Sequence, residues 1–174
     1  MNEYGSITAI IAAIFALIFF AFQSYTRRFG APWVPTPYKI IRRMLVLADV
    51  KPGDIVYDLG SGDGRVIIEA ARSFGAKAVG IEIDPLRFVW AKAKIFFLGL
   101  SGSVNVLFGN FFKINISDAD IIAIYLLPET NIKLINKFTE ELRPGTRIVS
   151  NTFTLPGLKI INQDERLKIY VYIV

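Results

Sequence analysis

The sequence has neither cysteine nor histidine among its 174 residues. Without cysteine, the protein has no disulfide framework, no thiolate zinc site and no cysteine nucleophile. Without histidine, it has no Ser-His-Asp triad and no imidazole acid–base chemistry. Any catalysis must therefore be of a kind that needs neither side chain.

Charge is also scarce, because charged residues make up 20% of the chain and hydrophobic residues 53%. The net charge of +5 is a mild excess. It is compatible with an acidic partner or an anionic membrane surface, but it is too small to indicate a nucleic-acid-binding protein. The length allows one modest domain and one hydrophobic accessory segment.

The hydrophobic accessory segment is an uncharged apolar stretch near the start of the chain, from Tyr4 to Phe22. Its length is close to the roughly 20 residues that a helix needs to cross a bilayer. A signal peptide and a buried core helix are the alternatives, but the start lacks the basic region of a signal peptide. Two arginines follow the stretch, so the positive-inside rule places the rest of the chain in the cytoplasm. We expect a single-pass membrane protein with residues 1–28 as its anchor.

After the anchor, the proline-rich residues 29–37 are expected to form an extended linker, and residues 38–174 a catalytic domain. Apolar periodicity in this domain alternates between strand and helix. Strands are predicted at 55–59, 78–83, 104–108, 121–126 and 146–151, and helices at 38–48, 65–74, 85–98 and 130–142. Residues 158–162 and 167–174 are predicted to form an antiparallel hairpin. The predicted fold is α/β, a doubly wound, mostly parallel Rossmann-like sheet with this hairpin at its edge.

The helix predicted at 85–98 has an unusual mixture of side chains. We expect its large apolar residues, Trp90, Phe96 and Phe97, to lie in the core. Its basic residues Arg87, Lys92 and Lys94 are expected to form a solvated face.

A glycine-rich segment, Asp58-Leu-Gly-Ser-Gly-Asp-Gly64, lies between the first predicted strand and the next helix. This is the position at which open parallel sheets bind ligands. A dinucleotide fingerprint would need glycine at position 65, which is arginine, and no Gly-Lys-Ser/Thr follows for a nucleoside triphosphate. Asp58 would repel a pyrophosphate and attract an ammonium group, so a zwitterionic amino-acid moiety is the better ligand. A sharp turn that binds nothing is the alternative.

A second acidic residue ends the next predicted strand. Glu82 follows Gly60 by 22 residues, close to the spacing at which an acid meets ribose hydroxyls. Asp84, directly before Pro85, is instead expected to cap the following helix.

These two motifs in this order resemble those of class I S-adenosylmethionine-dependent methyltransferases. Three further segments narrow the resemblance: Val34-Pro-Thr36-Pro37, Ile124-Tyr125-Leu-Leu-Pro128 and Ser150-Asn-Thr-Phe-Thr-Leu-Pro156. With them, the chain is similar to the small protein-lysine methyltransferases of archaea and to their mitochondrial relatives, which modify an ATP synthase ring protein and the adenine nucleotide translocase.

The resemblance implies that S-adenosyl-L-methionine is the cofactor. Asp58 and Gly60 would hold its methionine end, Glu82 its ribose, and Thr36 would close over it. Asn110 stands where the family often has an acid near the adenine. Phe111 or Phe112 would stack beside the ring, although both are also expected as core residues. The implied cofactor-binding set is Thr36, Asp58, Gly60, Gly62, Gly64, Glu82, Asn110 and Phe111.

Methyl transfer from a sulfonium is an in-line displacement, which needs alignment and no metal. The residues expected at the methyl-accepting site are Tyr125, Pro128 and Asn151. The chain lacks the Asn/Asp-Pro-Pro-aromatic motif with which related enzymes grip planar amides, which argues against such substrates. The resemblance implies a protein with an accessible lysine as the partner. The alternatives are a methyltransferase acting on RNA or a small molecule, a catalytically silent membrane scaffold, and, more distantly, a nicotinamide oxidoreductase.

Overall fold

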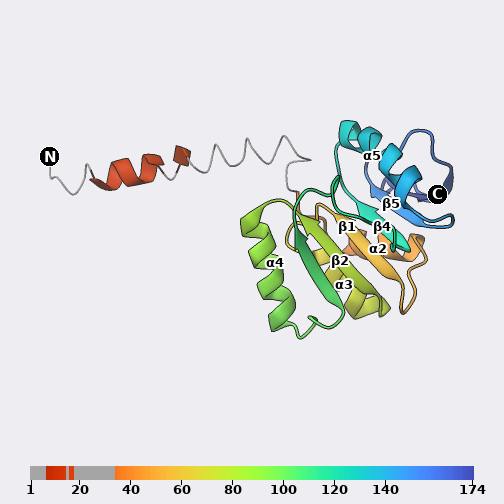
Figure 1. Cartoon of the computed structure of the whole chain (residues 1–174), viewed down its shortest axis with the longest axis horizontal. Helices are drawn as coiled ribbons and strands as arrows, with labels where there is room; N and C mark the ends of the chain where they lie inside the picture. Colours follow the sequence, from red (N-terminus) through yellow and green to blue (C-terminus); the bar gives the residue numbers. More distant parts are fainter. Residues whose placement is uncertain (1–6, 15, 18–33) are drawn as a thin grey trace.

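A seven-stranded sheet is the centre of the structure, a computed structural model that describes residues 7–14, 16–17 and 34–174 (Figure 1). The strand order is β3-β2-β1-β4-β5-β7-β6. β1 to β5 are parallel, and β7 and β6 are antiparallel to their neighbours. The strands are β1 Ile55–Leu59, β2 Lys77–Glu82, β3 Val104–Phe108, β4 Ile121–Ile124, β5 Arg147–Asn151, β6 Ile160–Asp164 and β7 Ile169–Ile173.

Helices cover both faces of this sheet, as its continuously apolar strands require. The helices are α2 Tyr38–Leu47, α3 Arg65–Phe74, α4 Pro85–Phe97 and α5 Pro128–Glu141. One core cluster contains buried residues of α2, α3 and α4, and the other contains buried residues of α5 together with the loop between β3 and β4. The predicted α/β class, the mostly parallel sheet and the antiparallel C-terminal hairpin at its edge are therefore confirmed.

The observed element boundaries lie within two residues of the predicted ones. β4 ends at Ile124 and not at position 126, because the chain turns there toward Pro128, the first residue of α5. Proline is favoured at this position because the first helical N–H has no partner in the helix. In the hairpin, β6 begins at Ile160 and β7 at Ile169, each two residues later than predicted.

The predicted membrane anchor lies largely outside the described residues. In the described part, residues 7–14 and 16–17 are helical. No helix within the described ranges combines the length and the apolar character needed to cross a bilayer.

The expectation that the large side chains of α4 lie in the core is wrong. Trp90, Phe96 and Phe97 are 64%, 71% and 84% exposed. The prediction of a solvated basic face also fails in part, because Lys94 pairs with Asp63 at 3.2 Å and Arg87 with Asp84 at 3.0 Å. The helix packs Phe88, Ala91 and Ile95 against the sheet, so Trp90, Phe96 and Phe97 face outward.

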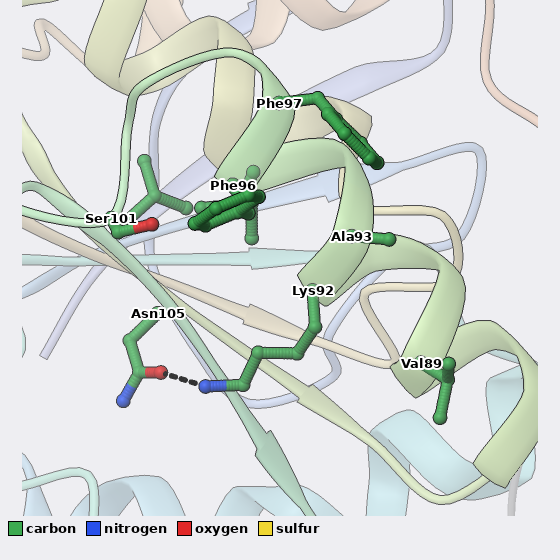
Figure 2. A pocket seen from close by; sticks show the side chains of 9 residues that line it. Val89, Lys92, Ala93, Phe96, Phe97, Ser101 and Asn105 are labelled. Atoms are coloured by element: carbon green, nitrogen blue, oxygen red, sulfur yellow. Dashed lines mark hydrogen bonds between the residues drawn. The ribbon is translucent and has the colours of Figure 1, made fainter.

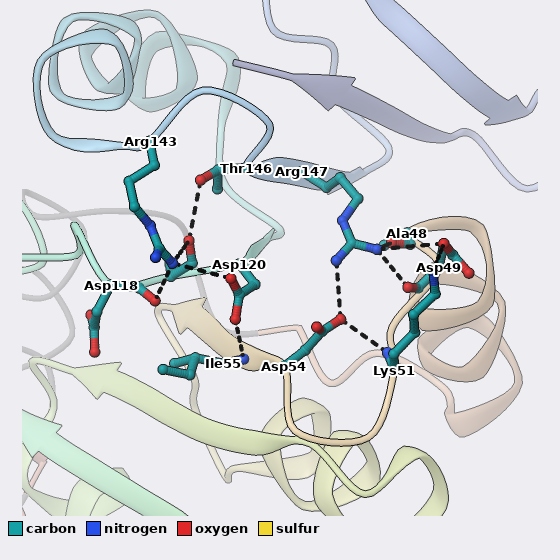
Figure 3. A network of polar contacts seen from close by, with 11 residues as sticks. Ala48, Asp49, Lys51, Asp54, Ile55, Asp118, Asp120, Arg143, Thr146 and Arg147 are labelled. Carbon is teal, nitrogen blue, oxygen red and sulfur yellow. Dashed lines mark hydrogen bonds and ion pairs between the residues drawn. The ribbon is translucent and has the colours of Figure 1, made fainter.

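A polar network ties together the loops at the amino-terminal ends of the parallel strands (Figure 3). Arg147, the first residue of β5, donates to Asp54 at 3.0 Å and to carbonyl groups of the turn after α2. Arg143 donates to Asp120 at 3.1 Å, and Asp120 accepts from the backbone N–H of Ile55 at 2.9 Å. These contacts connect the loops at the amino-terminal ends of the strands. The carboxyl ends of the strands are not involved in them.

Candidate cofactor and methyl-acceptor site

Four of the predicted site residues, Asp58, Glu82, Tyr125 and Asn151, lie at the carboxyl ends of parallel strands or directly after them. Asp58 is opposite Gly80 of β2 and Ala123 of β4, so it lies in the central strand between them. The order of the strands reverses between β1 and β4, which makes this edge the switch point at which doubly wound sheets bind ligands. Glu82 and Asn151 end β2 and β5, and Tyr125 directly follows β4.

The glycine turn between β1 and α3 uses its own N–H groups. The N–H groups of Gly60 and Ser61 donate to the carbonyl of Ile81 at 2.9 and 3.1 Å, and that of Gly62 donates to Glu82 at 2.7 Å. Gly60 and Gly62 have φ values of 88° and 55°, which residues with a Cβ rarely adopt. These three N–H groups are therefore already bonded and not free for a phosphate group.

Gly80 is a residue whose role the sequence reasoning missed. A Cβ at this position would lie 2.5 Å from Ser61 Oγ and 2.8 Å from Ile67 Cδ1. Only glycine at position 80 therefore allows the glycine turn after β1 to pack directly on β2. The signal was available in the sequence, as a glycine inside a strand indicates a close backbone approach.

Asp58 is a buried carboxylate without a hydrogen-bond partner. Its residue is 6% exposed. No donor in the described part of the chain bonds to its oxygens. Burial, followed by the negative charges of Glu82 and Asp63, raises the pKa of Asp58 to about 8. An unpaired buried acid is costly, so this position is suited to a ligand that supplies positive charge.

Glu82 is also buried, but its carboxylate is already oriented. Its two oxygens accept from the N–H groups of Gly62 at 2.7 Å and Asp84 at 2.8 Å. Burial raises the pKa of Glu82, and the two backbone hydrogen bonds oppose that shift. Each carboxylate oxygen retains a second lone pair, so Glu82 can still accept from two hydroxyl groups. Asp84 caps α4 through hydrogen bonds from Leu86 and Arg87, as predicted.

Arg65 links the segment before α2 to the glycine turn. It donates to the carbonyl of Thr36 at 2.9 Å and makes two 2.9 Å hydrogen bonds with Asp63. Its guanidinium also lies 5.7 Å from the centre of the Tyr38 ring. Thr36 is 8% exposed, so this contact holds it against the domain. Sequence reasoning noted Arg65 only as a missing glycine, because its partner is 29 positions away in the chain.

Asn110, Phe111 and Phe112 follow β3, and two of their side chains already have contacts within the protein. The side-chain oxygen of Asn110 accepts from the N–H of Phe112 at 2.9 Å, which leaves the amide N–H₂ as its free donor group. Phe111 is 5% exposed and belongs to the core cluster on the α5 face, which matches the core alternative. Phe112 is partly buried, with its ring centre 4.8 Å from that of Phe111. The roles of Asn110 and Phe111 in cofactor binding remain predictions.

At the other side of the crevice, β4 and β5 bring two aromatic rings together. The rings of Tyr125 and Phe153 are stacked, with centres 6.5 Å apart and planes at 25°. Phe153 is placed by a tight turn in which Thr152 has a φ of 69°. Strained backbone of this kind is often found at functional sites. Asn151 is 6% exposed and accepts from the Thr152 hydroxyl at 3.3 Å, while Pro128 is exposed at the start of α5.

The described residues contain no cluster of three or more acidic side chains that could hold a metal ion. The site has instead two buried carboxylates on one side, a pair of stacked aromatic rings on the other, and a chain segment held beside them.

Comparison with known proteins identifies the family to which the chain belongs. Residues 58–162 match the ANTKMT methyltransferase domain. The chain is 43% identical over 150 residues to a protein-lysine N-methyltransferase of Saccharolobus islandicus (strain REY15A), covering 82% of this chain and 93% of that protein. It is 31% identical over 135 residues to the adenine nucleotide translocase lysine N-methyltransferase of Mus musculus, covering 78% of this chain and 58% of that protein.

A solved structure is similar over nearly the whole domain. It is a Salinibacter ruber protein, described as an RNA methyltransferase in complex with S-adenosyl-L-homocysteine. The TM-score is 0.78 and the identity 41%, covering 81% of this chain and 94% of that chain. From the matched domain and the 43% identity to the Saccharolobus relative, the chain belongs to the ANTKMT methyltransferase domain family.

Proposed function

We propose that this protein is an S-adenosyl-L-methionine-dependent protein-lysine N-methyltransferase. The observation that carries the proposal is the buried carboxyl group of Asp58 at the switch point of the sheet, to which no donor of the described residues bonds. The cofactor bears an ammonium and a sulfonium, and it supplies an activated methyl group. The Saccharolobus relative at 43% identity is itself named as a protein-lysine N-methyltransferase.

Residues of this chain have separate roles in binding the cofactor. Asp58 would pair with the ammonium group, and the free lone pairs of Glu82 would accept from the ribose hydroxyls. Gly60 and Gly62 allow the backbone to approach closely. Thr36, held by Arg65, would cover the bound molecule and exclude water.

The acceptor side has to orient a neutral amine. An unperturbed lysine has a pKa near 10.4, so only about one in 10³ to 10⁴ is neutral at pH 7. A dry site lowers that pKa, because desolvation disfavours the ammonium form. The rings of Tyr125 and Phe153 would supply apolar walls for the lysine side chain, and Asn151 a carbonyl acceptor for the amine. The chemistry needs no further acid or base beyond the loss of a proton to water.

RNA is the second candidate substrate, because the Salinibacter ruber structure is described as an RNA methyltransferase. This chain lacks the Asn/Asp-Pro-Pro-aromatic motif at the end of β4, where Tyr125-Leu-Leu-Pro128 stands instead. Its positive excess is also small. We therefore favour protein lysine over RNA.

One experiment separates the two substrates and tests the proposed function. The purified full chain is incubated with methyl-labelled S-adenosylmethionine and a cell lysate. The expected label is sensitive to protease and, after acid hydrolysis, is found in methylated lysine. Label in a nuclease-sensitive fraction would instead identify an RNA methyltransferase, and the absence of label would reject both.

We also propose that residues 1–28 anchor the chain in a membrane, with the catalytic domain facing the cytoplasm. The support is the uncharged stretch from Tyr4 to Phe22 and the arginines after it. The helical residues described in this stretch expose their large apolar side chains by 50% to 70%: Ile7, Ile10, Ile11, Ile14 and Leu17. Resistance to alkaline extraction and sensitivity to protease only from the cytoplasmic side are the expected results. Recovery of the chain in the soluble fraction would contradict the anchor.

A further inference from the structure

The outer face of α4 has a group of exposed large apolar side chains that the fold and the proposed site do not explain. Leu86, Val89, Trp90, Phe96 and Phe97 are 62% to 84% exposed. Single exposed apolar residues are common on soluble proteins, but a contiguous group of large ones usually marks an interaction surface.

The arrangement of these side chains is regular. At about 100° per residue, the five exposed residues and Ala93 fall on one arc of the helix. The opposite arc, with Ala91 and Ile95, packs on the sheet. Because Phe88, Ala91 and Ile95 already fill the core-facing side, Trp90, Phe96 and Phe97 are additional to what the fold needs.

Basic side chains border this apolar arc, which we call the α4 outer face. Lys92 lies at one border, where it donates to Asn105 at 2.8 Å (Figure 2). Arg87 and Lys94 lie at the other border, where they pair with Asp84 at 3.0 Å and Asp63 at 3.2 Å. Lys92 retains its charge, because Asn105 is neutral. No acidic residue occurs from position 85 to position 98.

A hollow extends the outer face toward β3. It has a volume of about 560 Å³ and lies between the carboxyl half of α4 and the start of that strand. Figure 2 shows Val89, Ala93, Phe96 and Phe97 along its helical side, with Ser101 and Asn105 opposite. Its apolar walls and open mouth suit a flexible hydrocarbon chain.

We propose that the α4 outer face binds the surface of an anionic lipid bilayer. Apolar and aromatic side chains on one arc, with lysine and arginine at its borders, are the pattern of a helix that lies in the membrane interface. Lys92, which pairs with no acidic side chain of the described residues, complements anionic headgroups. A second copy of this chain would bring the same basic borders opposite one another, so charge disfavours that occupant.

The position of α4 gives the contact a functional consequence. The helix begins at Pro85, three residues after Glu82, so its first turn lies beside the proposed cofactor site. A bilayer against the outer face would thus hold the crevice near the membrane surface. This inference is independent of the nature of the methyl acceptor and of the proposed anchor.

The test uses Trp90 as a reporter in the full chain. The chain has two tryptophans, so Trp33→Phe leaves Trp90 alone. The protein is incorporated in phosphatidylcholine–phosphatidylglycerol vesicles with or without brominated acyl chains, which quench tryptophan only on contact. We expect brominated lipid to reduce Trp90 emission at least two-fold and to leave it little accessible to aqueous acrylamide.

A matched pair of variants separates the outer face from general hydrophobicity. Phe96→Ser with Phe97→Ser removes the two most exposed aromatic residues of α4 and should abolish the quenching. Ile132→Ser, at a residue of α5 that is 57% exposed, should leave it unchanged. Cofactor binding, measured on each variant, controls for folding, because none of these residues belongs to the proposed site.

Three results would overturn the proposal. Trp90 could be open to acrylamide and not quenched by brominated lipid, which would mean a solvated face. It could be protected from both, which would mean that protein, either a second copy or the N-terminal segment, covers the face. Or the Phe96→Ser, Phe97→Ser variant could be quenched as strongly as its parent.

Discussion

Asp58 is the single residue on which the proposed cofactor site most depends. It is buried, it has no hydrogen-bond donor among the described residues, and its pKa is raised to about 8. A carboxylate in this state destabilises the free protein and gains most when a cation binds. Its neighbour Glu82, in contrast, is already held by two backbone N–H groups.

The first prediction at the residue scale concerns cofactor affinity. Asp58→Asn keeps the size of the side chain and removes its charge, so S-adenosylmethionine binding should weaken by at least about 30-fold, the lower end for loss of a buried charge pair. Asp49→Asn, at an exposed position, is the matched control and should bind normally. Calorimetric titration of both variants measures this, and equal affinities would exclude Asp58 from the site.

The second prediction concerns the stability of the ligand-free protein. Because the folded pKa of Asp58 lies above the unfolded value of 3.8, its contribution to stability is full below pH 4 and is lost as pH rises to about 8. Asp58→Asn should therefore gain free energy of unfolding relative to wild type across this range. The gain should reach on the order of 3–5 kcal/mol at pH 8.5. Denaturant unfolding at pH 5 and pH 8.5 measures it, and a pH-independent difference would contradict the buried charge.

At the scale of elements, we expect the contact between the segment before α2 and the start of α3 to control access to the proposed cofactor site. Arg65→Met should release Thr36 and increase the dissociation rate of the cofactor about 10-fold, since it removes one charged hydrogen bond and the Asp63 pair. Arg65→Lys should give an intermediate rate, because lysine keeps the charge without the planar fork. Stopped-flow dissociation tests this, with Arg72→Met on the exposed side of α3 as control.

The loops at the opposite edge of the sheet should affect stability alone. Arg147→Met removes hydrogen bonds to Asp54 and to the turn after α2, so the free energy of unfolding should fall by about 2–3 kcal/mol. Cofactor affinity should not change, because these contacts lie at the amino-terminal ends of the strands. A variant with normal stability and weakened binding would show that the two edges are coupled.

Elements also show which parts of the structure the sequence could predict. The strands at 55–59 and 104–108 and the helix at 65–74 have the predicted bounds, because their apolar patterns are long and their ends have glycine or proline. The orientation of α4 could not be predicted in the same way. The usual rule places aromatic residues inward, and only the packing of Phe88, Ala91 and Ile95 on the sheet shows that Trp90, Phe96 and Phe97 face outward.

At the scale of the whole molecule, the parallel topology explains why the candidate site could be predicted from motifs that lie far apart in the sequence. Residues that end β1, β2 and β5 share one edge once the strands are known to be parallel. Contacts that depend on the direction of a side chain could not be predicted from the sequence. The Arg65 hydrogen bond to Thr36 and the stacking of Tyr125 with Phe153 are of this kind.

The most direct test of the central claim is the number of protons released when the full chain binds S-adenosylmethionine. At pH 6.5, a carboxyl group with a pKa of about 8 is almost fully protonated in the free protein, and a bound cation would ionise it. Calorimetry in buffers of different ionisation enthalpy should therefore detect release of close to one proton per cofactor bound. Binding without proton release would mean that the cofactor is not seated on the buried carboxylate of Asp58.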